Sequence, residues 1–190
     1  MSLSTMVLLG VLMVTGLYVI MLYNGLVQVK HGVSRAWSNI DVLLKQRHDE
    51  LSKLVEVCKQ YKAFEQATLQ NVVEARNRVQ TARQQENMGA LGVAEGQLRR
   101  GLGQIFAVAE AYPELRTNQN FMQLQNRISE LENAIADRRE FYNDSVNINN
   151  VRIEQFPDMV VARLFGFGEK KLLEFSETEK RDVDMKTLFS

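Results

Sequence analysis

The side chains that could do chemistry in this sequence are few and widely separated. The two histidines, His31 and His48, would lie about 25 Å apart on one helix, so they cannot share a metal ion within the chain. Neither follows a glutamate by three residues, so the Glu-x-x-His pattern of di-iron bundles is missing. Two Gly-x-Gly pairs, at 101–103 and 166–168, lack the third glycine and the preceding strand of a phosphate-binding loop. We therefore expect no catalytic, cofactor-binding or metal-binding residues and no enzyme activity.

The balance of charge and the cysteine count exclude further classes of protein. Lys and Arg together number 23, and so do Asp and Glu, so no overall positive charge would attract nucleic acid. The single cysteine, Cys58, cannot form an internal disulfide or a multi-cysteine metal site. Because it stands on an apolar stripe, we interpret it as a small buried side chain rather than a reactive thiol.

Polar residues that interrupt or flank the apolar stripes are more informative. They are Arg47, Arg138, Arg139, Tyr142, Asn143 and Asn149. A buried arginine needs a partner, because an unpaired charge in the core costs several kcal/mol. The carboxylates that could pair with Arg47 are Asp41, Glu65, Glu74 and Glu110. We interpret the six residues as a polar network that sets helix register; the alternative is a groove that binds a peptide or an anionic headgroup.

These residues must be positioned by long helices. One apolar stripe runs in steps of three and four through Val33, Trp37, Ile40, Leu44, Leu51, Leu54, Cys58 and Tyr61. This spacing predicts a long helix with one narrow apolar face that needs other helices as partners. The stripe changes phase after Tyr61, so we place a turn near Lys62.

Three further stripes indicate three further helices. They run from Phe64 to Ala82, from Leu91 to Tyr112 and from Phe121 to Phe156. Pro113 and Pro157 follow the last two stripes and end those helices. Strand patterns are nearly absent. The predicted fold is therefore all-α, with an antiparallel up-and-down four-helix bundle over residues 25–165.

A membrane helix is expected before the bundle. Met6 to Tyr23 is almost wholly apolar and would reach about 27 Å as a helix, the thickness of a bilayer's hydrocarbon core. A cleaved signal peptide is the alternative, but no Lys or Arg precedes the run and no small-residue cleavage site follows it. We therefore predict a retained transmembrane anchor over residues 1–24, continued directly into the first bundle helix. Lys30, His31 and Arg35 follow the span, which places the rest of the chain in the cytoplasm.

The C-terminal part has a different composition. Residues 166–190 carry mixed charge with little periodicity, and we expect a flexible tail. In an even-numbered antiparallel bundle the last helix returns toward the bilayer. We therefore expect Phe165, Phe167, Lys170 and Lys171 to make a contact close to the membrane.

Several stretches of this chain resemble the bacterial LemA family. They are YNGLV (23–27), AWSNIDVLLKQRHDEL (36–51), LVEVCKQYKAFE (54–65), VVEAR (72–76), AVAEAYPEL (107–115), FYNDSV (141–146) and FPDMVVARLFGF (156–167). The resemblance covers essentially the whole chain and implies a single-pass membrane protein with an antiparallel four-helix domain and no known catalytic residues. Magnetosome members tie the family to membrane organisation, and members are often associated with membrane metalloproteases of the HtpX kind. Phe64 stands where the family commonly has histidine, which weakens any expectation of a metal.

These observations together predict a scaffold in the bacterial inner membrane. Its expected partners are the lipid bilayer, further copies of the chain, and membrane proteins that include a membrane protease. The alternative function is an adaptor or regulator of a metalloprotease of the HtpX kind. An enzyme of an unrecognised kind is a third possibility, which would require a deep pocket with convergent titratable groups.

Overall fold

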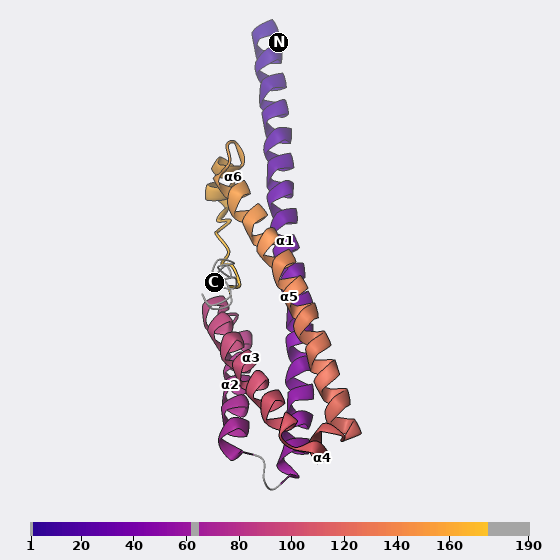
Figure 1. The fold of residues 1–190 in the computed structure, drawn as a ribbon. Helices are drawn as coiled ribbons and strands as arrows, with labels where there is room; N and C mark the ends of the chain where they lie inside the picture. Colours follow the sequence, from indigo (N-terminus) through magenta and orange to yellow (C-terminus); the bar gives the residue numbers. More distant parts are fainter. Residues whose placement is uncertain (1, 62–64, 175–190) are drawn as a thin grey trace, which may run out of the picture. The chain divides into compact units, whose positions relative to one another are not determined.

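The computed structural model describes residues 2–61 and 65–174, and all of its regular elements within these ranges are helices (Figure 1). They are α1 (Leu3–Lys59), α2 (Gln66–Gln84), α3 (Met88–Glu110), α4 (Pro113–Arg116), α5 (Gln119–Glu154) and α6 (Asp158–Phe165). The predicted all-α class is confirmed. The predicted turn at Lys62 lies outside the described residues; α1 ends at Lys59 and α2 begins at Gln66.

The chain divides into two compact units. The N-terminal unit comprises Met1–Ser38 and Glu140–Lys171, and the bundle unit comprises Asn39–Arg139 and Leu172–Ser190. Both α1 and α5 contribute one part of their length to each unit. We describe each unit by itself.

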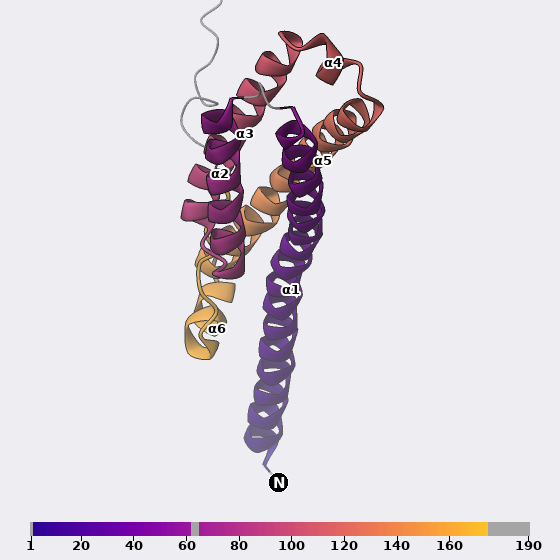
Figure 2. The ribbon, with the colours of Figure 1, turned by 90° about the horizontal axis from the view of Figure 1, so that it is seen from below.

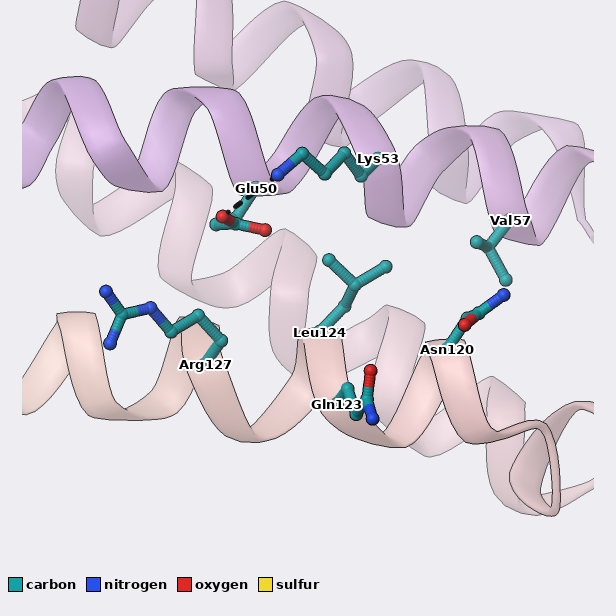
Figure 3. Close-up of a pocket in the computed structure, with 7 residues that line it drawn as sticks. All are labelled: Glu50, Lys53, Val57, Asn120, Gln123, Leu124 and Arg127. Atoms are coloured by element: carbon teal, nitrogen blue, oxygen red, sulfur yellow. Dashed lines mark hydrogen bonds and ion pairs between the residues drawn. The ribbon is translucent and has the colours of Figure 1, made fainter.

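The bundle unit contains four long helical segments that alternate in direction, with the short helix α4 between the third and the fourth. Asp41 and His48 on α1 pair with Arg83 and Arg76 on α2, so α2 runs antiparallel to α1. In both views α2 and α3 lie side by side (Figures 1 and 2), and Arg78 donates a 3.0 Å hydrogen bond to Gln97. The α5 segment is antiparallel to α1, because Glu50 lies near Arg127 and Val57 near Asn120 in the groove that these two helices line (Figure 3). This is the antiparallel four-helix bundle that the stripes predicted.

The core of the bundle unit is built from the predicted apolar stripes. Its largest fully buried side chains come from α1, α3, α4 and α5; they are Ile40, Leu44, Leu51, Leu54, Leu91, Leu98, Leu102, Ile105, Leu115, Phe121 and Ile128. Gly101 of α3 allows close approach to α2, because a Cβ at this position would lie 2.8 Å from Cγ2 of Val72. The glycine is therefore a packing residue of the α2–α3 contact.

Capping side chains fix the helix starts in the bundle unit. The Asn87 side chain accepts a hydrogen bond from the Ala90 amide at the start of α3. The Asn118 side chain accepts a hydrogen bond from the Phe121 amide at 3.1 Å, at the start of α5. Each side chain satisfies an amide that has no partner within its own helix.

The N-terminal unit begins with the apolar part of α1. An 18-residue window of this helix is long and apolar enough to cross a membrane, and none of that window is buried in the protein. Farther along, Leu26 of α1 is buried against Val161 and Ala162 of α6. Val19, Leu22, Ile153 and Phe167 pack around these three residues. The predicted apolar N-terminal helix is present, and its last turns contact α6.

A non-helical segment follows α6. Gly166 has a φ of 71°, a left-handed conformation that ends helices and favours glycine. Residues 167–174 form no helix. The predicted flexible tail of residues 166–190 is described only as far as Glu174.

Candidate functional site

The most deeply buried charges of the bundle unit belong to an ion pair between α1 and α3. The guanidinium Nη2 of Arg47 donates to the carboxylate Oε1 of Glu95. Only 3% of Arg47 and 4% of Glu95 is exposed. The sequence predicted a partner for Arg47 but proposed four other carboxylates. Glu95 was missed although it stands among Leu91, Ala94 and Leu98 on the α3 stripe, and that position was the available signal.

A second carboxylate lies close to this pair. Oε1 of Glu132, on α5, is 3.9 Å from Nη1 of Arg47, beyond the reach of a hydrogen bond. Burial raises the pKa of the Glu132 carboxyl above its ordinary value, and this outweighs the opposing effects of Arg47 and Arg99. The Nε of Arg47 and Oε1 of Glu132 are buried without a hydrogen-bond partner in the described chain. The arrangement is a partly satisfied polar network inside a helical core.

Polar contacts also fix α2 against α1. Arg76 places its Nη2 2.7 Å from the His48 Nε2 and donates from Nε to the His48 carbonyl at 3.1 Å. Since a guanidinium can only donate, Nε2 of His48 accepts and the ring is neutral. Burial is the main cause that lowers the pKa of His48, and Arg76 adds to it. Arg83 donates to Asp41 at 2.9 Å farther along the same pair of helices.

An open groove lies between α1 and α5 in the bundle unit (Figure 3). It has a volume of about 450 Å³ and is lined by Glu50, Lys53, Val57, Asn120, Gln123, Leu124 and Arg127. In Figure 3, Glu50 and Lys53 form an ion pair on α1, with an N–O distance of 3.1 Å, and Arg127 lies across from them on α5. Its amides and charges of both signs suit a polar peptide better than an apolar ligand.

The six residues predicted as a polar network fall into both units. Arg47, Arg138 and Arg139 belong to the bundle unit, and Tyr142, Asn143 and Asn149 belong to the N-terminal unit. Arg138 is exposed. Burial, followed by the nearby Arg99, lowers the pKa of Arg139. Which of the six form a functional network stays a prediction.

In the N-terminal unit, α5 side chains hold the segment that follows α6. The Tyr142 hydroxyl donates to the Lys171 carbonyl at 3.0 Å, and the buried Asn149 amide donates to the Gly168 carbonyl at 3.3 Å. Asn150 both accepts from the Lys170 amide and donates to the Lys170 carbonyl, each at 2.9 Å. Two of the predicted polar residues therefore bind backbone. Asn150 was missed because its partner belongs to a segment without periodicity.

Aromatic residues gather where the apolar part of α1 meets α6. The Tyr23 ring lies 4.9 Å from the Phe165 ring and 5.7 Å from the Phe167 ring, centroid to centroid, both edge to face. Arg152 of α5 donates to the Asp158 carboxylate of α6 at 3.0 Å. The predicted membrane-proximal residues Phe165 and Phe167 thus share a cluster with the last residue of the apolar run.

The described residues contain neither a group of metal ligands nor a reactive thiol. Over the described ranges, 2–61 and 65–174, no three His, Cys, Asp or Glu side chains lie close enough to hold a metal ion. Cys58 is fully buried, and burial raises the pKa of its thiol to about 12. Such a thiol is inert at neutral pH.

Comparison with known proteins adds to this geometry. A family model described as the LemA family matches residues 36–187. The magnetosome protein MamQ 2 of Paramagnetospirillum magneticum is 24% identical over 191 residues, covering 88% of this chain and 70% of that protein. The magnetosome protein MamQ of Magnetospirillum gryphiswaldense matches with the same identity and coverage. Protein LemA of Metamycoplasma hominis is 25% identical over 169 residues, covering 87% of this chain and 74% of that protein. The family match therefore takes in most of the chain, from the middle of α1 onward.

Proposed function

This chain belongs to the LemA family, and from that premise we propose that it is a membrane-anchored scaffold without catalytic activity. In this proposal α1 crosses the bacterial inner membrane and the helical bundle lies on the cytoplasmic side. Copies of the chain associate side by side and organise the membrane or its protein complexes.

The observation that carries the proposal is the exposed apolar part of α1. Side chains such as Leu8, Leu12 and Val14 are 59%, 59% and 68% exposed. Each large apolar side chain of this kind gains roughly 1.5–3 kcal/mol when it leaves water, and a bilayer would remove all of them at once. Lys30 and His31 follow the window and are exposed, which supports a cytoplasmic bundle.

Self-association is supported by an apolar surface on α5 in the N-terminal unit. Phe141, Ile148 and Val151 are 53%, 57% and 44% exposed. Their spacing of seven and three places them along one side of the helix; we call them the α5 outer face. Two chains fixed in one membrane have already lost much rotational freedom, so a small apolar contact suffices to pair them. A second copy of the chain is therefore the occupant that we propose for this face.

Crosslinking in native membrane vesicles tests this surface. Ile148→Cys should give a crosslinked dimer with a short bis-maleimide, because two copies of the α5 outer face would bring these positions together. Cys58 will not interfere, since its thiol is buried. Ser34→Cys is the matched control, an exposed position of the same unit that lies on α1 and not on the α5 outer face. Equal and weak yields at both positions, unchanged by adding Val151→Lys, would contradict self-association through α5.

The alternative function is an adaptor or regulator of a membrane metalloprotease of the HtpX kind. The groove between α1 and α5 favours it, because its polar and charged lining suits a peptide segment of another protein (Figure 3). Deleting residues 175–190 leaves the hydrogen bonds of Lys170 and Lys171 in place. Ile148→Cys crosslinking should survive this deletion if the chain is a scaffold. Loss of protease recruitment on this deletion, in a chain that gives no specific crosslink at Ile148→Cys before or after the deletion, would favour the adaptor.

A further inference from the structure

We propose that α6 is a second membrane contact, a short helix seated in the lipid interface beside the end of the α1 span. Phe156, Val160 and Leu164 would face the acyl chains and headgroup boundary of the bilayer. This inference rests on the proposed anchoring of α1. It differs from the expectation drawn from the sequence, in which Phe165, Phe167, Lys170 and Lys171 make the contact.

The helix α6 packs beside the last turns of the apolar part of α1. Its buried residues Val161 and Ala162 pack with Leu26, and Val19 and Leu22 border the same cluster. From Val19 to Leu26 α1 rises about 10 Å. This interval includes the last turn of the apolar run and the first turn beyond it. If α1 spans the bilayer, α6 is held at the depth where interfacial helices lie.

The outward side of α6 is apolar. Val160 and Leu164, one helical turn apart, are 56% and 76% exposed, and the preceding Phe156 is 81% exposed. A helix on a water-soluble surface carries polar residues on the side that faces away from its partner. Here α6 is apolar on both sides, and its packed side lies in a cluster that Val19 and Leu22 of the apolar run border. A bilayer that covers the apolar run would therefore reach the outward side of α6 as well.

The charged side chains of this region are compatible with a position at the lipid interface. The carboxylate of Asp158 is paired with Arg152 at 3.0 Å and is nearly buried, so α6 presents little free negative charge. Arg163 is exposed and long enough to extend its guanidinium to the headgroups. Tyr23, in contact with Phe165 and Phe167, supplies the aromatic residue that typically marks the membrane boundary.

Depth-dependent quenching in proteoliposomes tests the inference on the full chain. Leu164→Cys is labelled with an environment-sensitive fluorophore; the buried thiol of Cys58 stays unlabelled. We expect blue-shifted emission that is quenched more strongly by a lipid nitroxide near the headgroup than by one near the chain end. Glu169→Cys, an exposed position after α6, is the matched control and should stay accessible to aqueous iodide.

A label at Val14→Cys separates this inference from the anchoring proposal. Val14 lies within the apolar run and is 68% exposed, so it should be quenched by the deeper nitroxide. Quenching at Val14 without quenching at Leu164 would overturn the interfacial role of α6 and leave the anchor in place. No lipid quenching at either position would overturn both. A Leu164 label shielded from iodide yet unquenched by lipid would show that a protein covers α6, and would also overturn the inference.

Discussion

The buried ion pair between Arg47 and Glu95 gives the sharpest prediction about stability. Replacing Glu95 with leucine leaves the Arg47 guanidinium in the core without its hydrogen-bonded partner. Breaking a buried pair from one side costs about 3–5 kcal/mol. Glu132, 3.9 Å from Arg47 with a side chain 22% exposed, can offset part of the loss. We therefore expect Glu95→Leu to destabilise the chain by about 3 kcal/mol.

The double variant Arg47→Met/Glu95→Leu should recover most of that loss. It replaces both charges with apolar groups of similar size, a change that is often neutral or stabilising. Urea unfolding of the full chain in mild detergent, followed by far-UV circular dichroism, measures the difference. With a slope of about 2 kcal/mol per molar urea, the single variant should lower the midpoint by about 1.5 M, and the double variant should stay close to the wild type.

An exposed pair on α5 serves as the control for this measurement. Arg127 and Glu130 lie 3.4 Å apart with side chains 53% and 69% exposed, and Glu130→Leu should change stability by less than about 1 kcal/mol. The reasoning would be refuted if the double variant were less stable than Glu95→Leu. That result would mean that the charges stabilise the core beyond what their apolar replacements supply.

Three further perturbations test other parts of the account by the same urea assay. Gly101→Ala should lower the free energy of unfolding by about 1–3 kcal/mol, because its Cβ would lie 2.8 Å from Cγ2 of Val72. Gly103→Ala, which has open space around it, should raise that free energy by up to about 1 kcal/mol, and changes of the same sign in the two variants would contradict the close α2–α3 contact. The raised pKa of Glu132 means that the folded chain holds the carboxyl proton more tightly than the unfolded chain does, so the stability from this proton is lost as pH rises from the ordinary pKa of 4.5 through the folded pKa. The stability of the wild type relative to Glu132→Gln should therefore fall over that pH range, and a stability difference that does not change with pH would exclude the effect. The lowered pKa of His48 has the opposite consequence, because stability is lost as pH falls from the ordinary pKa of 6.5 through the folded pKa. The His48→Gln variant should therefore lose less unfolding free energy than the wild type on acidification, and parallel profiles of stability against pH would rule out a role for this ring.

The helices were predictable because their apolar stripes are long and regular. The stripe from Val33 to Tyr61 is buried at most of its positions, and the interruption at Arg47 correctly indicated a buried charge. Two prolines indicated where the later helices end. Both signals, the apolar stripes and the prolines, act on the local backbone, so these helices could be predicted without knowledge of distant contacts.

The partner of Arg47 could not be predicted in the same way. Choosing among the carboxylates requires the register between α1 and α3, which depends on how the side chains of both helices pack. A search for carboxylates on buried stripe positions would have found Glu95.

The segment after α5 was also beyond sequence reasoning. Eight residues of α6 are too few to show a clear period, and apolar residues on both sides of the helix hide which side packs. The bonds from Asn149 and Asn150 join side chains to backbone groups about 20 positions away. Backbone groups are the same at every residue, so such contacts leave no trace in residue type.

In the proposed function, copies of this chain are held in the membrane by α1 and assemble through their helical parts. The most direct measurement is the mass of the full-length protein in native-membrane nanodiscs prepared without detergent at ordinary expression. We expect particles that contain two or more copies of the chain, and a lower copy number when Ile148 on the α5 outer face is replaced by lysine. A single copy in every particle, or complete release of the intact chain from vesicles by alkaline carbonate, would contradict it.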